Sequence, residues 1–164
     1  MVPEIKKILY STDLSENAKY AFGYAASIAN RYGAGITLLH VLDHGSPYRE
    51  SLMVNVLGEK KWNEIVKENE ASIVETFKER LKTFCDEMAA QLPACEFITD
   101  KVEVKVGHPV DRILEEAEKL DCDLVIMGAH GHGILGDAMM GSVSRRVLRR
   151  CKKPVLIVRL PEEK

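Results

Sequence analysis

The sequence lacks a strong excess of charge of either sign. Its 23 Lys and Arg residues stand against 25 Asp and Glu residues, which gives a net charge of −2. Nucleic acids and anionic lipids attract proteins through a large positive field, and a chain with this balance has no such field. We therefore expect neither nucleic acid nor a membrane as a partner.

Long hydrophobic runs are also missing. No apolar segment approaches the roughly 20 residues that a membrane-spanning helix needs. The first residues, 1–7, have no apolar stretch of the kind that a signal peptide carries. We expect a cytoplasmic protein. The length of 164 residues suits one sizeable core, so one domain over residues 1–164 is the expected organisation.

Closely paired cysteines are absent as well. The four cysteines are scattered and include no Cys-x-x-Cys: Cys85, Cys95, Cys122 and Cys151. Structural zinc sites and redox dithiols both rely on close pairs. We expect reduced thiols that pack as small apolar side chains, and no bound metal.

Apolar runs and helical patterns alternate along the chain. Short, densely apolar or alternating runs predict strands at 5–10, 35–42, 101–106, 122–127 and 154–160. Apolar residues at helical spacing predict helices at 15–32, 59–92, 109–120 and 142–151. This alternation predicts an α/β fold, a single doubly wound sheet of five parallel strands with helices on both faces.

Several segment boundaries carry their own signals. Gly33 follows the first helix as a C-cap, and Pro109 sits where a helix can begin without losing a hydrogen bond. In residues 43–58 the apolar residues follow neither helical nor strand spacing, which predicts a flexible loop. The apolar stripe of the helix at 59–92 is expected to face the sheet.

The loop after the first strand is one candidate site. In a doubly wound sheet, ligands bind beyond the carboxyl ends of the strands, where the strand order reverses. Ser11, Thr12 and Asp13 offer two hydroxyls and a carboxylate at the start of a helix. Helix capping is the alternative interpretation, because Asp13 and Glu16 have the spacing of a capping box.

A glycine-rich loop after the fourth strand is the second candidate. Gly128 and Gly131 are followed, after nine further residues, by Gly141 and Ser142 at the head of a helix. Glycines let the backbone approach a ligand closely, and the N–H groups at a helix N-terminus attract phosphate oxygens. The Ser142 hydroxyl adds a donor, so the loop indicates a cradle for nucleotide phosphates. A surface turn with Ser142 as an ordinary N-cap is the alternative.

The spacing of this loop resembles the ATP-binding motif of the universal stress proteins. That motif reads Gly-x-x-Gly, nine residues, Gly-Ser, and it matches Gly128 to Ser142. The likeness covers nearly the whole chain, because three further segments agree in order and distance: Ser11-Thr12-Asp13, His40-Val41 and Lys153 to Val158. The resemblance implies the adenine nucleotide alpha-hydrolase-like fold, with strand order 3-2-1-4-5.

The resemblance also implies a role for each matching residue. Ser11, Thr12 and Asp13 would border the adenosine, with Asp13 beside the ribose. Adenine would face the backbone of residues from the second and fourth strands, namely Val41, Met127 and Gly128. The phosphates would be held by Gly131, Gly141, Ser142, Val143 and Ser144. His130 fills a position where family members often have histidine, and a solvated loop histidine is its alternative. The implied ligand is ATP, or AMP or ADP, with Mg²⁺ as a companion of the phosphates.

The function implied by the resemblance is that of a sensor in the stress response. Nucleotide binding, with little or slow hydrolysis, would order the segment 43–58 and change the surface offered to an unknown protein partner. The last strand, Pro154 to Val158, is apolar on both faces and expected at a sheet edge. There it would pair with its own copy in a homodimer, as the resemblance also implies.

The same residues also bear on other functions. Gly131 to Gly136 satisfies Gly-x-Gly-x-x-Gly, but it follows the fourth strand and the next strand ends with Arg159, which disfavours an NAD enzyme. Without a Gly-Lys-Ser/Thr, fast NTP hydrolysis is not expected, and a slow ATPase or nucleotidyl transferase is the remaining enzymatic alternative. The pair His130 and His132 with Asp137 is a weak metal pattern. A dimeric interaction module without nucleotide is the third class.

Overall fold

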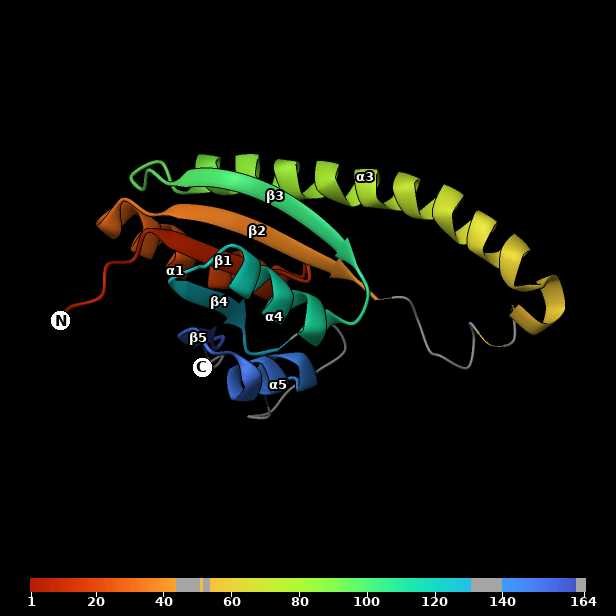
Figure 1. Ribbon diagram of the computed structural model, residues 1–164. Helices are drawn as coiled ribbons and strands as arrows, with labels where there is room; N and C mark the ends of the chain where they lie inside the picture. The colour runs from red at the N-terminus through yellow and green to blue at the C-terminus, as the bar shows by residue number, and fades with distance from the viewer. Residues whose placement is uncertain (44–50, 52–53, 131–139, 162–164) are drawn as a thin grey trace.

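Five parallel strands form one sheet in the order β3-β2-β1-β4-β5 (Figure 1). The computed structural model describes residues 1–43, 51, 54–130 and 140–161, apart from the side chain of Glu16. The strands are β1 (Lys7–Ser11), β2 (Gly35–Leu42), β3 (Ile98–Val106), β4 (Leu124–Gly128) and β5 (Val155–Val158). The expected fold class and strand order are confirmed.

Helices cover both faces of the sheet. On one face lie α1 (Glu16–Tyr32) and α3 (Glu59–Gln91), and on the other lie α4 (Pro109–Lys119) and α5 (Ser142–Arg150) (Figure 1). Each face has its own apolar core. Ile8 and Tyr10 belong to the cluster under α1 and α3, whereas Leu9 between them belongs to the cluster under α4 and α5. This alternation is that of a strand buried on both sides.

Glycine and proline mark the end of α1 and the start of α4, as the sequence predicts. Gly33 ends α1 in the left-handed region with φ 63°, and its N–H closes the helix. Pro109 opens α4, where its missing N–H costs no helical hydrogen bond. Gly107 makes the turn between β3 and α4 with φ 141°, and a Cβ there would lie 2.7 Å from Nε of Arg112.

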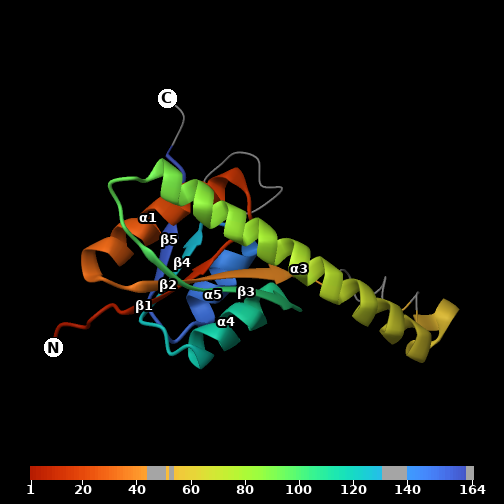
Figure 2. The same ribbon diagram turned by 90° about the horizontal axis from the view of Figure 1, so that it is seen from above.

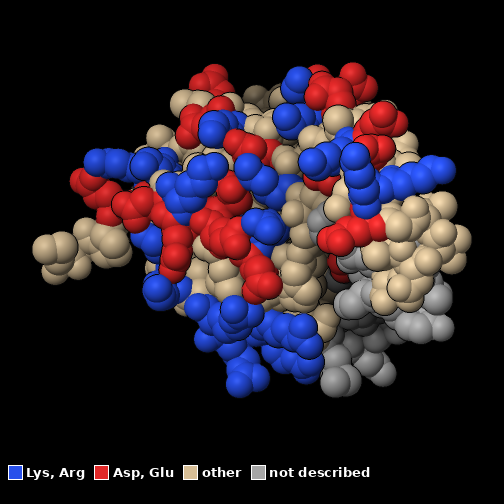
Figure 3. All heavy atoms as spheres, turned by 45° about the vertical axis from the view of Figure 1, so that its right-hand side comes forward, with Lys and Arg blue, Asp and Glu red and all other residues tan. Residues whose placement is uncertain are grey.

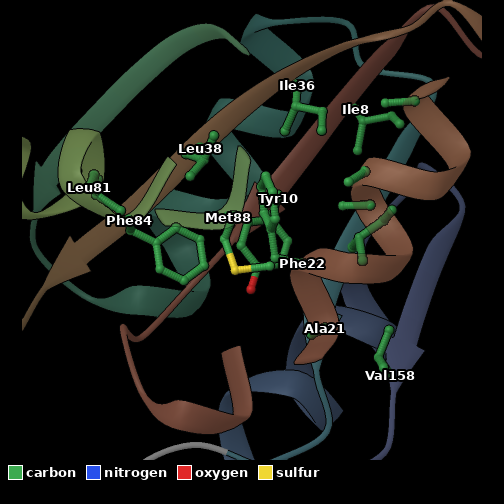
Figure 4. Close-up of a cluster of buried hydrophobic side chains, with 14 of the residues drawn as sticks. Ile8, Tyr10, Ala21, Phe22, Ile36, Leu38, Leu81, Phe84, Met88 and Val158 are labelled. Carbon is green, nitrogen blue, oxygen red and sulfur yellow. The ribbon is translucent and has the colours of Figure 1, made fainter. Parts of the chain in front are cut away.

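Aromatic rings fill the core under α1 and α3. The Phe22 ring lies edge-on to three other rings, with centroids 5.2 Å from Tyr10, 5.3 Å from Phe84 and 5.2 Å from Phe97. Figure 4 shows Phe22 reaching from α1 toward Tyr10 on β1 and Met88 on α3. Phe22 therefore joins the layer of α1 and α3 to the sheet through contacts between aromatic rings.

The expectation that the whole apolar stripe of α3 faces the sheet is wrong. Only Leu81, Phe84 and Met88 of this helix are buried, and Ile73 is 46% exposed. A helix of 33 residues spans about 50 Å, whereas the nine residues of β3 span about 30 Å. The first half of α3 accordingly extends beyond the sheet (Figures 1 and 2).

Other boundaries also differ from the sequence prediction. Residues 54–57, placed in a loop, are helical, and Gly58 closes the turn by donating its N–H to the Val54 carbonyl at 2.9 Å. The rest of the predicted loop includes 44–50 and 52–53, which lie outside the described residues. β3 begins at Ile98, three residues earlier than predicted, because it pairs along the full length of β2. Gly128 belongs to β4.

Basic side chains gather over α5, at the bottom of Figure 3. Arg150 forms an ion pair with Asp111 of α4 at 3.3 Å. The other three arginines of the helix are exposed and make no ion pair within the described part of the chain: Arg145, Arg146 and Arg149. Arg149 and Arg150 occupy the last turn, where positive charge complements the helix dipole.

Replacing Phe22 with Ala should destabilise the fold strongly. The substitution removes a fully buried ring that contacts three others, so we expect the free energy of unfolding in urea to fall by about 3–5 kcal/mol. Tyr24→Ala on the same helix is the matched control, because Tyr24 is 47% exposed. A similar loss in both variants would contradict the role given to Phe22.

Candidate functional site

The carboxyl ends of β1, β2 and β4 and the starts of α4 and α5 enclose a cavity of about 430 Å³. It lies where β1 pairs with β2 on one side and β4 on the other, so the strand order reverses there. The structure brings together at this cavity every described residue of the predicted site: Ser11, Thr12, Asp13, Val41, Met127, Gly128, His130, Gly141, Ser142, Val143 and Ser144. Gly131 lies outside the described residues.

Six further residues line the cavity that sequence reasoning did not assign to it: Tyr10, Ala18, His40, Asp43, Pro109 and Ile113. Their positions explain why. Pro109 and Ile113 belong to α4, which follows the outer strand β3 and was expected only to cover the sheet. His40 and Asp43 flank the predicted Val41, so proximity in sequence was the available signal for them.

The carboxylate of Asp13 is held by the start of α1. Its Oδ1 accepts hydrogen bonds from the backbone N–H of Ser15 at 3.0 Å and from the Ser15 hydroxyl at 2.6 Å. Ser15 is the N-cap residue, so Asp13 does not occupy the N-cap position that the capping box assigns to it. Asp13 instead lies two residues before the cap, at the cavity wall.

Thr12 is held by three hydrogen bonds. Its N–H donates to the Leu39 carbonyl at 2.9 Å, and its hydroxyl oxygen accepts from the N–H of Leu14 at 3.0 Å. Its carbonyl oxygen lies 2.8 Å from Nδ1 of His40. Leu14 has φ 61°, a left-handed conformation that a residue with a Cβ adopts at a cost. The loop therefore keeps its shape through hydrogen bonds rather than through relaxed backbone.

At the start of α5, some hydrogen-bond donors bond to other parts of the protein and others have no acceptor within the helix. The N–H of Gly141 donates to the Ala129 carbonyl at 2.7 Å, and the Ser144 hydroxyl donates to the Gly128 carbonyl at 2.7 Å. Gly141, not Ser142, is the N-cap. Because the first intrahelical acceptor, the Gly141 carbonyl, serves Arg145, the N–H groups of Ser142, Val143 and Ser144 have no acceptor within the helix.

These features give the cavity two chemically different parts of its lining. At the start of α5, N–H groups without a helical acceptor and the positive end of the helix dipole favour an anionic group. In the loop after β1, the Asp13 carboxylate can accept hydrogen bonds from hydroxyl groups. Apolar surface from Val41, Met127 and Ile113 lies among them. The arrangement suits a ligand with a phosphate, a polyol and a flat apolar part.

Neither a metal cluster nor a membrane span is found among the described residues. Within the described ranges, no group of three or more His, Cys, Asp and Glu side chains is placed to hold a metal ion. His132 and Asp137, the other members of the weak metal pattern, lie outside those ranges. No helix among the described residues combines the length and apolar character needed to cross a bilayer.

A second cavity, of about 440 Å³, lies between α4 and residues 150–153. Ion pairs join the same two segments: Arg150 with Asp111 at 3.3 Å and Lys152 with Glu118 at 2.9 Å. Its charged side chains are thus engaged with each other, which makes it a weaker candidate for a ligand site.

Comparison with known proteins decides the family. The model of the universal stress protein family matches residues 4–159. The chain belongs to that family. Universal stress protein MJ0577 of Methanocaldococcus jannaschii is 32% identical over 154 residues, covering 94% of each chain. The expected resemblance is confirmed.

Solved structures of universal stress proteins have the same fold. The structure of MJ0577 has a TM-score of 0.71 and 28% identity, covering 98% of this chain and 100% of that one. A universal stress protein in complex with cAMP has a TM-score of 0.60 and 22% identity, covering 96% and 98%. One from Archaeoglobus fulgidus in complex with dAMP has 0.54 and 19%, covering 94% and 98%.

The burial of Tyr10 predicts that the stability of this universal stress protein depends on pH. Burial raises the pKa of Tyr10 well above its usual range, and the nearby Asp13 carboxylate raises it further. The unfolded chain releases this proton at about pH 10, while the folded chain still holds it. The free energy of unfolding should therefore fall as pH rises above about 10. Urea unfolding between about pH 8 and pH 11 measures the slope.

The control for this slope is Tyr10→Phe, which has no proton to lose. Removing the hydroxyl ends its hydrogen bond to the Ala18 carbonyl, at a cost of about 1 kcal/mol near neutral pH. The variant should lose less stability than the wild type at high pH. An identical slope in both proteins would contradict the effect assigned to Tyr10.

Proposed function

We propose that this universal stress protein binds ATP, or AMP or ADP, in the cavity and acts as a nucleotide-dependent sensor in the stress response. The observation that carries the proposal is that the first three residues of α5, whose N–H groups have no acceptor within the helix, line the same cavity as Asp13. The nucleotide would occupy that cavity between the loops after β1 and β4. We further propose that it works in the cytoplasm as one domain over residues 1–164.

Each part of the nucleotide has a matching wall. The phosphates would accept hydrogen bonds from the N–H groups of Ser142, Val143 and Ser144. The ribose hydroxyls would donate to Asp13, and the adenine would lie against Val41 and Met127. Gly131 is assigned to the phosphate loop with Gly141. Mg²⁺ would accompany the phosphates and take oxygen ligands from them.

Two structural neighbours support adenine nucleotides as the ligand class. One universal stress protein was solved with cAMP and another with dAMP. Both ligands combine adenine, a sugar and one phosphate, which are the groups that the cavity walls suit. ATP adds two phosphates, and the open donors at the start of α5 favour that added charge.

In the sensor role, the free energy of nucleotide binding shifts the population of protein conformations and does not drive a chemical reaction. Calorimetric titration with ATP, followed by product analysis after long incubation with Mg²⁺, separates the three classes of function. Binding with negligible turnover supports the sensor. Brisk turnover would favour a nucleotide-cleaving or nucleotidyl-transfer enzyme, and absence of binding would leave the interaction module.

A homodimer through the last strand is the second part of the proposal. β5 is at the edge of the sheet and pairs only with β4 among the described strands. Pro154 and Val158 direct their carbonyls at β4, so alternation turns the backbone groups of Val155 and Ile157 toward the open edge. A second copy of the strand would satisfy those groups. A protein partner would then recognise the nucleotide-bound dimer.

Ser142→Pro tests the phosphate donors. Ser142 is the first residue of α5, where proline is tolerated, and Gly141 has φ −56° and ψ 153°, as a residue before proline requires. The variant loses one N–H donor while the helix start is kept. We expect ATP affinity to fall about tenfold or more by calorimetry.

Ser142→Ala is the matched control, because it removes the hydroxyl and keeps the N–H. Its affinity should fall less than that of Ser142→Pro. Unchanged affinity in the folded proline variant would remove the α5 N-terminus from the phosphate site.

Ile157→Pro tests the dimer. Proline removes an N–H that faces the open edge of β5 and leaves the bonds to β4 in place. We expect light scattering to give a dimer mass for the wild type and for Ile157→Val, and a monomer mass for Ile157→Pro. A folded Ile157→Pro protein that remains dimeric would show that the copies associate through another surface.

A further inference from the structure

We propose that His40 is a positioning residue for the nucleotide loop, and that it ties this loop to α3 through the ring of Phe77. The proposal rests on the nucleotide site proposed above and assigns a function to the His40-Val41 segment beyond the backbone of Val41. It concerns three contacts, from His40 to Thr12, from His40 to Phe77, and from Phe77 to Arg80.

The contact with Thr12 fixes the protonation of the His40 ring. Nδ1 lies 2.8 Å from the Thr12 carbonyl oxygen, and a carbonyl oxygen can only accept a hydrogen bond. Nδ1 therefore carries a proton and donates it. His40 is only 9% exposed, so loss of this donor would leave a carbonyl without its partner in a buried place.

The contact with Phe77 fixes the orientation of the ring. The two rings are stacked, with centroids 4.9 Å apart and planes 11° apart. The guanidinium carbon of Arg80, one turn further along α3, lies 5.0 Å from the Phe77 centroid. Phe77 is not a lining residue of the cavity, but it stacks on His40, which is one, so this contact joins α3 to the site.

The loop needs this support because its backbone is held under strain. Leu14 is in the left-handed region, and its N–H is held by the Thr12 hydroxyl. Thr12 in turn is held by Leu39 through its N–H and by His40 through its carbonyl. Asp13 lies between Thr12 and Leu14 in the chain. The direction of the Asp13 carboxylate at the cavity therefore depends on Thr12 staying in place.

Three variants of His40 separate the donor from the ring. His40→Asn keeps a donor at the place of Nδ1, His40→Gln places its donor near Nε2, and His40→Phe keeps a stacking ring with no donor. We expect ATP affinity within about threefold of wild type for Asn, and a loss of about tenfold for Gln and Phe. Rescue by Gln instead of Asn, equal losses in all three, or no loss in any would overturn the proposal.

Phe77→Leu tests the link to α3. Loss of the stacking partner should weaken ATP binding several-fold, although Phe77 does not line the cavity. Phe84→Leu is the matched control, because it is the same change on the same helix at a residue 6% exposed that packs on Phe22. Phe84→Leu should lower the unfolding temperature and leave ATP affinity unchanged. Equal effects of the two variants on affinity would overturn the link.

Hydrogen exchange in the absence of nucleotide keeps this test independent of ATP binding. The amides of Leu14 and Ser15 are both hydrogen-bonded within the loop. Their protection should be lost in His40→Phe and kept in His40→Asn. If the wild type fails to bind ATP, the proposed function fails, and the exchange result alone decides whether His40 positions the loop. Unchanged protection in His40→Phe would show that it does not.

Discussion

The central place of β1 is the constraint on which the site depends. β1 pairs with β2 along one edge and with β4 along the other, and all three strands run in the same direction. Their carboxyl ends therefore meet at one edge of the sheet, while the chain leaves β1 for one face and enters α5 on the other. The diverging connections leave a cavity that side chains of the sheet do not fill. The candidate site residues lie at the ends of these strands, in their connections and at the start of α5, far apart in sequence.

The cavity walls use some of their polar groups for structure and leave others for a ligand. The N–H of Gly141 and the hydroxyl of Ser144 donate hydrogen bonds to carbonyls at the end of β4. These two bonds fix the start of α5 against the sheet. The remaining N–H groups of the first turn have no acceptor within the helix, and their residues line the cavity. On the opposite wall, Thr12 is held from three sides, and Asp13 follows it. Such preorganisation lowers the entropy that a ligand must overcome.

The sequence predicted the sheet, and it singled out residues that the structure brings to one cavity, because both leave local signals. Buried parallel strands are apolar on both faces, and Gly-x-x-Gly with a distant Gly-Ser marks a close backbone approach. It could not predict what depends on distant partners. The apolar stripe of α3 is the same whether or not a sheet lies under it, so the overhang of its first half was missed. The directions of the Ser144 hydroxyl and the His40 ring are set by Gly128, Thr12 and Phe77, which no local spacing reveals.

The proposed function requires that the loop after β1 and the start of α5 contact the same nucleotide. Amide NMR spectra recorded during an ATP titration of the full chain test it directly. We expect the N–H signals of Ser142, Val143 and Ser144 to shift together with those of Thr12 and Asp13 at one common affinity. Shifts confined to the groove between α4 and residues 150–153, or shifts on only one of the two walls, would contradict it.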